Sequence, residues 1–263
     1  MKYALITGAY GGMGRAAVNA LKSAGYYVFA LDKRVEEATD GVLPIAYDAT
    51  NSESVSAAFE QVKSHTDRLD LVVHFAGIYT LNSLVEYTEE AFKTAFDINV
   101  FGVYRVNKAA MPFLKKGSKI LVTTSELAPL DPLPFTGLYA VTKSTLDKYA
   151  YSLRMELQLL GVSVVVLRPG AVDTGLLDVS TRALDAFCEN TALYSCNAAR
   201  FKRVVESVEA RKVSPEKVGR KVAKIASKRN PKYVYKLNRN PLLLLLNCQP
   251  KRLQTWIIKQ ILK

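Results

Sequence analysis

Residues 3–14 read YALITGAYGGMG, an apolar run that ends in a cluster of glycines. The apolar run is typical of a strand buried on both faces, and a segment with helical periodicity follows the glycines. Glycines between a strand and a helix let the backbone turn sharply and leave the amides of the helix N-terminus open to an anion. This order predicts a loop that holds the pyrophosphate of a dinucleotide. The residues expected against that cofactor are Gly8, Tyr10, Gly12, Met13 and Gly14.

The alternation of apolar runs and helical segments continues beyond this loop. The apolar runs lie at 3–7, 26–31, 69–77, 119–124 and 162–170, and the helix candidates at about 12–24, 51–64, 88–115 and 138–160. A repeating strand–helix order indicates a doubly wound parallel sheet of the Rossmann type, with helices on both faces. We expect a single α/β domain over residues 1–263. Because the alternation is lost after Asp173, the rest is predicted to form a helical substrate lid at about 175–212 and a C-terminal helical tail at about 238–263.

The charge of the chain is unevenly distributed. The net charge is +12, but residues 200–263 hold 18 Lys and Arg against 3 Asp and Glu, which leaves −3 for residues 1–199. The basic character therefore belongs to the C-terminal quarter, which argues against a nucleic-acid enzyme with a basic active face.

Cysteine and histidine are scarce. The three cysteines are odd in number, and neither they nor the two histidines show the spacing of a metal site. We therefore expect free thiols in a cytoplasmic, reducing compartment and no metal in the chemistry.

Asp32 closes the second apolar run, 18 residues after Gly14. Its carboxylate can accept hydrogen bonds from both hydroxyls of an adenosine ribose and would repel a 2′-phosphate, which favours NAD. Lys33 and Arg34 follow directly, and either could pair with a 2′-phosphate if Asp32 turned away, so NADP stays an alternative.

Tyr139 and Lys143 are four residues apart in a helical segment, which places both side chains on one face. A free phenol has a pKa of about 10, and an adjacent cation should lower that pKa toward working pH. The same spacing also fits a partly buried tyrosine packed beneath a solvated lysine. The glycine loop upstream favours a catalytic pair over that structural alternative.

The order TGxxxGxG, then Asn99, then Ser125, then YxxxK resembles the short-chain dehydrogenase/reductase family over residues 1 to about 175. The resemblance implies an NAD(P)-dependent oxidoreductase that interconverts an alcohol and its ketone or aldehyde by hydride transfer. It also implies that Tyr139 is the general acid/base and that Ser125 holds and polarises the substrate oxygen. Lys143 would bind the nicotinamide ribose and favour ionisation of Tyr139, and Asn99 would help hold a proton-relay water.

Further cofactor contacts follow from the same resemblance. They are Asp48 and Ala49 near the adenine, Ala76 and Gly77 near the adenosine, and Pro169, Gly170, Val172 and Thr174 beside the nicotinamide carboxamide.

The chain departs from the family pattern in two places. His74 and Phe75 stand where the family usually has two asparagines, so a different internal bracing is implied. His74 lies in an apolar strand, which favours a core histidine over a catalytic one. The prolines of residues 126–137 stiffen a loop that would form one wall of the substrate pocket.

The segment after Thr174 is helix-prone and apolar. Leu176, Leu177, Leu184 and Phe187 would suit an apolar substrate under a lid, although the same side chains could pack against the body of the domain. Steroid-like, retinoid-like or other lipid alcohols and ketones are the first choice of substrate. A small polar or acyl-carrier substrate is the second.

The C-terminal tail contains a run of five leucines, 242–246, that is too short to cross a bilayer. Leu253, Trp256, Ile257 and Ile261 fall toward one side of residues 251–263, which is typical of an interfacial amphipathic helix. A terminal helix docked on its own domain or on a neighbouring subunit is the alternative, and we expect a homodimer or homotetramer. Two rival functions stay open, a non-catalytic nucleotide-sensing protein and a membrane-associated scaffold of the same fold.

Overall fold

The computed structural model describes residues 1–209 and 211–263. The side chains of residues 175–181 and 207–209 lie outside that description, and Leu176 and Leu177 of the expected lid are among them. The strands are β1 Lys2–Thr7, β2 Tyr26–Asp32, β3 Val42–Ala46, β4 Leu69–His74, β5 Leu114–Thr123, β6 Ser163–Pro169 and β7 Val234–Leu237. The helices are α1 Gly12–Ser23, α2 Ser52–Lys63, α3 Glu89–Phe96, α4 Gly102–Ala110, α5 Gly137–Leu157, α6 Gly175–Asn190, α7 Ser195–Glu209, α8 Pro215–Ala226, α9 Pro241–Asn247 and α10 Lys251–Leu262.

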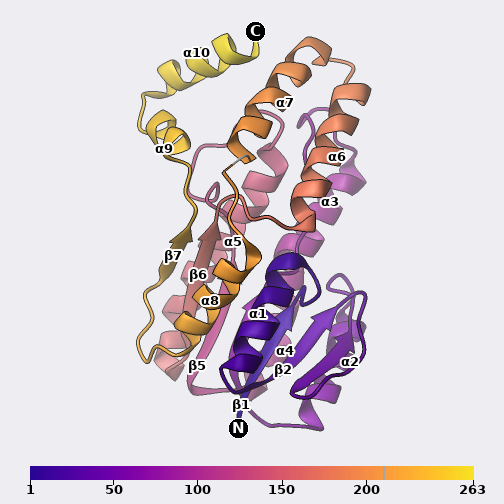
Figure 1. The fold of residues 1–263 in the computed structure, drawn as a ribbon, viewed down its shortest axis with the longest axis vertical. Coiled ribbons are helices and arrows are strands. Elements are labelled where there is room, and N and C mark those ends of the chain that lie inside the picture. Colours follow the sequence, from indigo (N-terminus) through magenta and orange to yellow (C-terminus); the bar gives the residue numbers. More distant parts are fainter. Residues whose placement is uncertain (210) are drawn as a thin grey trace.

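The strands form one seven-stranded sheet in the order β3-β2-β1-β4-β5-β6-β7, with every neighbouring pair parallel (Figure 1). The chain therefore winds outward from β1 to one edge, returns to β4 and winds outward to the other edge. The doubly wound parallel sheet predicted from the sequence is confirmed. In such a sheet ligands bind outside the carboxyl ends of the strands, where the winding reverses, which here is between β1 and β4.

Helices cover both faces of the sheet, and successive strand residues alternate between two cores. Leu5 of β1 packs with the side chains of α2, α4 and α5, whereas its neighbours Ala4 and Ile6 pack with those of α1 and α8. This alternation explains why the strands read as unbroken apolar runs, because both of their faces are buried.

Neither edge strand, β3 or β7, was predicted from the sequence. β3 is five residues long and contains Pro44, a residue that sheets tolerate at an edge because it cannot donate to the ladder. β7 has four residues in the basic C-terminal quarter and pairs with β6. The expectation that the α/β alternation ends at Asp173 is therefore wrong, because α8 packs on α1 and β7 extends the sheet.

The single helix expected at 88–115 is divided. α3 passes into a π-helical turn, Asp97–Phe101, and then into α4, which ends in a 3-10 turn, Met111–Phe113. Pro112 lies in that last turn, and β5 begins at once at Leu114 rather than at 119. The π-helical turn is a common feature of functional sites, and it contains Asn99.

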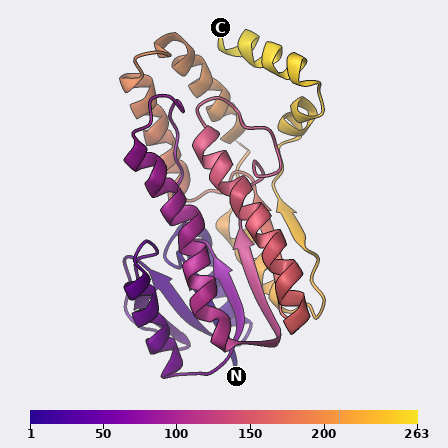
Figure 2. The ribbon, with the colours of Figure 1, turned by 180° about the vertical axis from the view of Figure 1, so that it is seen from behind.

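Helices α6, α7, α9 and α10 gather at the end of the molecule toward which the strands point, opposite the N-terminus (Figures 1 and 2). A buried aromatic cluster holds α6 and α7 to the domain. Phe135 is its centre, with ring centroids 4.6 Å from Phe187, 5.2 Å from Tyr194 and 5.2 Å from Phe201. Within residues 1–209 and 211–263, no helix is both long and apolar enough to span a membrane.

Candidate active site

One cleft at the carboxyl ends of the strands joins the glycine loop to the predicted catalytic residues. Among the residues predicted to contact the cofactor, it is lined by Met13, Gly77, Pro169, Gly170, Val172 and Thr174. Ser125, Tyr139 and Lys143 line the same cleft. The fold therefore brings together residues that are up to 161 positions apart in the sequence, at the location where doubly wound sheets bind dinucleotides.

The glycine loop has the geometry that its sequence indicates. β1 ends at Thr7, and Gly8 adopts a φ of +65°, a conformation that favours glycine. A Cβ on Gly8 would lie 2.6 Å from the backbone nitrogen of Ala76, so the loop also needs glycine for its close approach to the end of β4. α1 follows without a side-chain cap at Gly11. Its first amides are therefore available to a pyrophosphate, as a dinucleotide site requires.

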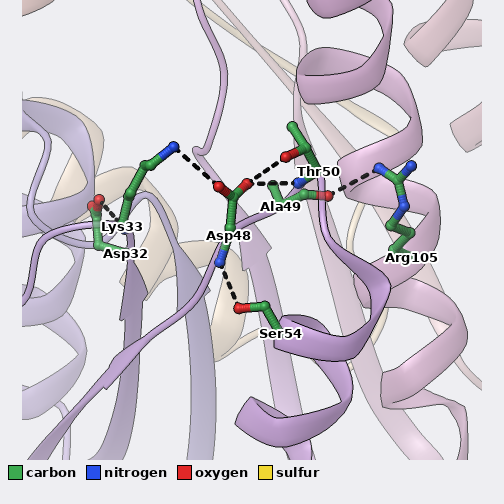
Figure 3. Close-up of polar contacts among 7 residues, drawn as sticks. All are labelled: Asp32, Lys33, Asp48, Ala49, Thr50, Ser54 and Arg105. Atoms are coloured by element: carbon green, nitrogen blue, oxygen red, sulfur yellow. Dashed lines mark hydrogen bonds and ion pairs between the residues drawn. The ribbon is translucent and has the colours of Figure 1, made fainter.

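Asp32 is held at the end of β2 by two backbone amides. Its Oδ2 accepts a hydrogen bond from Tyr10 N at 2.9 Å, and its Oδ1 accepts one from Lys33 N at 2.7 Å. The Lys33 ammonium points away to Asp48, with Nζ 3.0 Å from Oδ2 (Figure 3). The carboxylate of Asp32 is thus fixed in place, and the adjacent lysine is already paired.

Asp48 and Ala49, predicted near the adenine, follow β3 in a loop braced from several sides (Figure 3). Hydrogen bonds from Thr50, and then from Lys33, lower the pKa of Asp48 to about 2. On the other side Arg105 of α4 donates to the carbonyl oxygen of Ala49 at 3.0 Å. The loop that was predicted to lie near the adenine is therefore braced by side-chain hydrogen bonds from Thr50, Lys33 and Arg105.

Ser125, Tyr139 and Lys143 are buried at the base of the cleft, with exposed fractions of 6%, 9% and 7%. Ser125 follows β5, and the other two lie one turn apart in the first half of α5. The Ser125 hydroxyl donates a hydrogen bond to the Tyr139 hydroxyl. Lys143 Nζ lies 5.7 Å from the centre of the Tyr139 ring and 3.4 Å from the carbonyl oxygen of Thr123. The structure therefore brings the three predicted residues together.

Burial dominates the pKa values of this pair. Burial raises the pKa of Tyr139 to about 12, and the hydrogen bond from Ser125 opposes that rise. Burial likewise lowers the pKa of Lys143 to about 8. The expectation of a lowered pKa for Tyr139 is therefore wrong for the chain alone, because removal of the phenol from water outweighs its hydrogen bond with Ser125.

Asn99 is fully buried, and its amide is used in three hydrogen bonds. Its Oδ1 accepts from Ile78 N at 2.8 Å, and its Nδ2 donates to Ile78 O at 3.0 Å and to Thr142 Oγ1 at 3.1 Å. These bonds fix the backbone just after Gly77 at the floor of the cleft. A Cβ on Gly77 would lie 3.0 Å from Asn99 Oδ1 and 3.4 Å from Lys143 Nζ, so Asn99 and Lys143 converge there.

His74 is a core residue, as its place in an apolar strand predicted. Its side chain is 2% exposed, and Nε2 lies 2.8 Å from Asn107 Oδ1. Burial lowers the pKa of His74 to about 4, so the ring is neutral at pH 7. No group of three or more His, Cys, Asp or Glu within the described residues could hold a metal ion.

Several residues of the cleft were not predicted. The Tyr79 ring lies 4.9 Å from that of Tyr139, and Glu126 lies beside Ser125. Further lining residues are Leu127, Leu133, Phe201, Val204, Val205 and Leu243. Glu126, Leu127 and Leu133 belong to the loop at 126–137, which the sequence predicted as one wall of the pocket and which does line the cleft. No local pattern marks Phe201, Val204, Val205 and Leu243, because they reach the cleft only through the packing of α7 and α9 on that loop.

The two predicted lid residues whose side chains are described pack against the body of the domain, which was the alternative given for them. Leu184 and Phe187 are 1% and 4% exposed and pack with Phe135 in the aromatic cluster. They therefore hold α6 to the domain, and α7 supplies the apolar side chains that face the cleft.

Residues 2–185 match the family described as short chain dehydrogenase. The chain therefore belongs to the short-chain dehydrogenase/reductase family, whose members are oxidoreductases that bind nicotinamide dinucleotides. This confirms the resemblance drawn from the glycine loop, Asn99, Ser125 and the tyrosine–lysine pair.

Two relatives and one solved structure illustrate the similarity. The chain is 28% identical to a 3-ketodihydrosphingosine reductase of Bacteroides thetaiotaomicron, over 94% of this chain and 91% of that protein. It is 32% identical to estradiol 17-beta-dehydrogenase 2 of Mus musculus, over 66% of this chain and 49% of that protein. A short-chain dehydrogenase structure from Streptomyces avermitilis superposes with a TM-score of 0.78 at 20% identity, covering 99% of this chain and 96% of the other.

Proposed function

We propose that this protein reduces or oxidises an oxygen function on an apolar lipid, interconverting an alcohol and its ketone or aldehyde with a nicotinamide cofactor. The observation that supports this function best is the composition of the cleft. Ser125, Tyr139 and Lys143 supply polar groups at its base. Glu126 and several threonines also line it, but most of the other lining side chains, such as Leu133 and Phe201, are apolar. A largely apolar pocket with a few convergent polar groups suits a lipid with one reactive oxygen.

The chain's own residues would handle the proton and the substrate oxygen. A bound nicotinamide would supply or accept the hydride. In the direction of reduction, Tyr139 donates its phenolic proton to the substrate oxygen while Ser125 donates a hydrogen bond to the same oxygen, so both stabilise developing negative charge. Burial raises the pKa of Tyr139, so the phenol is protonated at neutral pH and has a proton to give.

Lys143 and Asn99 would support that step. In our proposal Lys143 holds the nicotinamide ribose, and its positive charge favours the ionised form of Tyr139 once the phenol has given up its proton. Asn99 keeps the floor of the cleft open next to Lys143, where a proton-relay water would bind. Three hydrogen bonds already fix its amide, so this residue is positioned before substrate arrives.

We propose NAD as the preferred cofactor. The fixed carboxylate of Asp32 would accept hydrogen bonds from the ribose hydroxyls and repel a 2′-phosphate, and Lys33 is paired with Asp48. We expect Asp32→Ser to lower kcat/KM with NADH and raise it with NADPH, a shift in preference of roughly tenfold or more. Asp40→Ser, at an exposed acidic residue after β2, is the matched control. Wild-type preference for NADPH would contradict the role given to Asp32.

The substrate class is tested by following NADH and NADPH oxidation with a panel of carbonyl compounds. The panel contains 3-ketodihydrosphingosine, steroid ketones, retinal, a 3-oxoacyl thioester and a small polar ketone. We expect turnover with one or more of the lipid ketones and kcat/KM values at least tenfold lower for the small polar ketone. Preference for the thioester would favour an acyl-carrier substrate. Absence of turnover with every compound and both cofactors would favour a non-catalytic protein.

We also propose a cytoplasmic location and a homodimeric or homotetrameric state. The free state of all three cysteines supports a reducing compartment. The oligomer is supported by apolar side chains left exposed on α4 and α5, among them Tyr104, Tyr151 and Met155.

A further inference from the structure

The C-terminal helix α9 forms part of the wall of the active-site cleft, and α10 follows it along the chain. Leu243 of α9 is one of the residues that line the cleft. The backbone nitrogen of Asn240, the N-cap of α9, donates to Glu126 Oε2 at 2.7 Å, and Lys251 at the start of α10 forms an ion pair with Asp131. Both acidic partners belong to the loop between β5 and α5. The tail is therefore docked on its own domain and shares a wall with the cleft.

Leucines cover α9 on its outer side as well as its inner side. Leu243 and Leu246 face a groove beside the loop of Leu127 and Leu133, whereas Leu242 and Leu245 are 64% and 62% exposed. A helix that is apolar all round is normally buried on all sides. The outer side of α9 is therefore exposed to solvent, although its leucines are typical of a buried helix.

The exposed face of α10 is basic and contains a tryptophan. Arg252, Trp256, Lys259 and Lys263 follow one another at spacings of four, three and four, so they form a row along one side of the helix. Trp256 is 58% exposed, and Leu253 next to this row is 40% exposed. The opposite side of α10 is docked, since Gln254 and Leu262 are buried. Residues 238–263 contain five basic residues and no acidic one.

The combination of exposed leucines, a half-exposed tryptophan and a basic row matches a bilayer surface that carries negative charge. Leucine side chains can enter the acyl region, tryptophan prefers the level of the headgroups, and lysine and arginine attract anionic lipids. A second copy of this chain fits less well, because a symmetric contact would place two basic rows against each other.

We propose that the outer faces of α9 and α10 dock on an anionic lipid surface and hold the mouth of the active-site cleft against it. Leu243 faces the cleft while its neighbours Leu242 and Leu245 face outward, so a lipid substrate could pass from the bilayer to Tyr139 along one short helix. The role in substrate entry rests on the proposed function, whereas the docking itself does not.

Trp256 allows a direct test, because it is the only tryptophan in the chain. Its fluorescence is measured for the full-length protein with vesicles of phosphatidylcholine, with and without phosphatidylglycerol. We expect a blue shift with the anionic vesicles that weakens in high salt, and quenching by lipids brominated on their acyl chains. Equal spectra with and without anionic vesicles would overturn the proposal. A blue shift that follows protein concentration without lipid would point to a second copy and would also overturn it.

Variants that retain Trp256 test the exposed leucines of α9 and the basic row of α10 separately. Leu242→Ser with Leu245→Ser should weaken vesicle partitioning by about tenfold or more, because two exposed apolar anchors are lost. Neutralising Arg252, Lys259 and Lys263 with glutamine should weaken it on the order of a hundredfold, at about fivefold per charge. Val85→Ser, at a valine 72% exposed between β4 and α3, is the matched control and should bind like wild type. Unchanged partitioning in both test variants would overturn the proposal.

Turnover distinguishes a failure of docking from a failure of the proposed function. The tail variants and wild type are assayed on the same lipid ketone dispersed in detergent and embedded in anionic vesicles. We expect near-equal activity in detergent and a loss of roughly tenfold or more for the variants in vesicles. Activity in detergent without vesicle binding would overturn docking alone. Vesicle binding without turnover on any lipid ketone would overturn the proposed function and the substrate path, while docking would stand.

Discussion

Tyr139 is a buried residue whose hydroxyl would exchange a proton in the proposed mechanism. Its side chain is buried, and that burial raises the pKa of its phenol to about 12. The hydrogen bond from Ser125 offsets part of that effect. In the proposed mechanism the phenol is therefore a proton donor, and acceptance of a proton depends on positive charge brought close to it.

Removal of the Tyr139 hydroxyl should abolish that delivery. We expect Tyr139→Phe to lower kcat by about 10²–10⁴-fold, the usual contribution of a general acid, and to change the cofactor Kd less than about threefold. Steady-state kinetics and fluorescence titration of NADH provide the two measurements. Tyr151→Phe, at a tyrosine 53% exposed on the same helix, is the control and should retain kcat. A near-normal kcat in Tyr139→Phe would refute the proposed mechanism.

His74 should make the protein sensitive to acid. Burial lowers its folded-state pKa to about 4 from an ordinary value of 6.5. Between these two values the unfolded chain binds a proton that the folded chain does not, so the free energy of unfolding falls as pH falls from 6.5 toward 4. At about 1.4 kcal/mol per pH unit, His74 contributes a loss of roughly 3 kcal/mol over that range.

Urea unfolding at pH 7 and at pH 4.5 measures this contribution. We expect the loss of stability on acidification to be about 2–3 kcal/mol smaller in His74→Gln than in wild type. The chain has one other histidine, the exposed His65, and His65→Gln should follow wild type. Parallel losses in all three proteins would show that His74 does not control the acid response.

At the scale of elements, Phe135 joins the loop before α5 to α6 and α7. Its ring is 8% exposed and contacts the rings of Phe187, Tyr194 and Phe201. Phe135 also has a φ of +64°, which is strained for a residue with a side chain. The aromatic contacts therefore offset a local backbone cost in the wall of the cleft.

Truncation of this ring should loosen α7 as well as the core. We expect Phe135→Ala to lower the free energy of unfolding by about 3–5 kcal/mol. It should also raise KM for a lipid ketone, because Phe201 contributes to both the cluster and the cleft. Phe92→Ala, at a ring 38% exposed on α3, should cost less than about 1.5 kcal/mol in the same denaturation experiment. If Phe135→Ala also lowers the free energy of unfolding by less than about 1.5 kcal/mol, the aromatic cluster does not hold α7.

The elements also show what local sequence can and cannot reveal. The segment from β1 to α1 and the pair on α5 were predictable because their spacing is written within a few consecutive residues. β3 and β7 were not predictable, because a short edge strand has few buried apolar side chains and β3 contains Pro44. Leu243 reaches the cleft only through tertiary packing of α9. Selectivity for substrate depends on such contacts, which explains why the chemistry could be inferred from sequence before the substrate could.

At the scale of the whole molecule, apolar side chains remain exposed along α4, α5 and the turns that flank them. These helices lie side by side on the face of the sheet shown in Figure 2, away from the cleft lined by α7 and α9. The exposed residues are Phe101, Tyr104, Val141, Tyr151, Met155, Leu159 and Leu160. We propose that this row is a protein interface, which a two-fold symmetric contact with a second copy would cover on both subunits.

Charge placed on this face should therefore separate the subunits. We expect wild type to sediment as a dimer or tetramer, and Tyr151→Glu with Met155→Glu to shift it to smaller species, because each charge would be desolvated at the interface. Leu193→Glu, at a leucine 65% exposed between α6 and α7, is the control and should sediment like wild type. If the double variant keeps the wild-type mass at the same concentration, the oligomer must use another face. If wild type is monomeric, the exposed row requires a different partner.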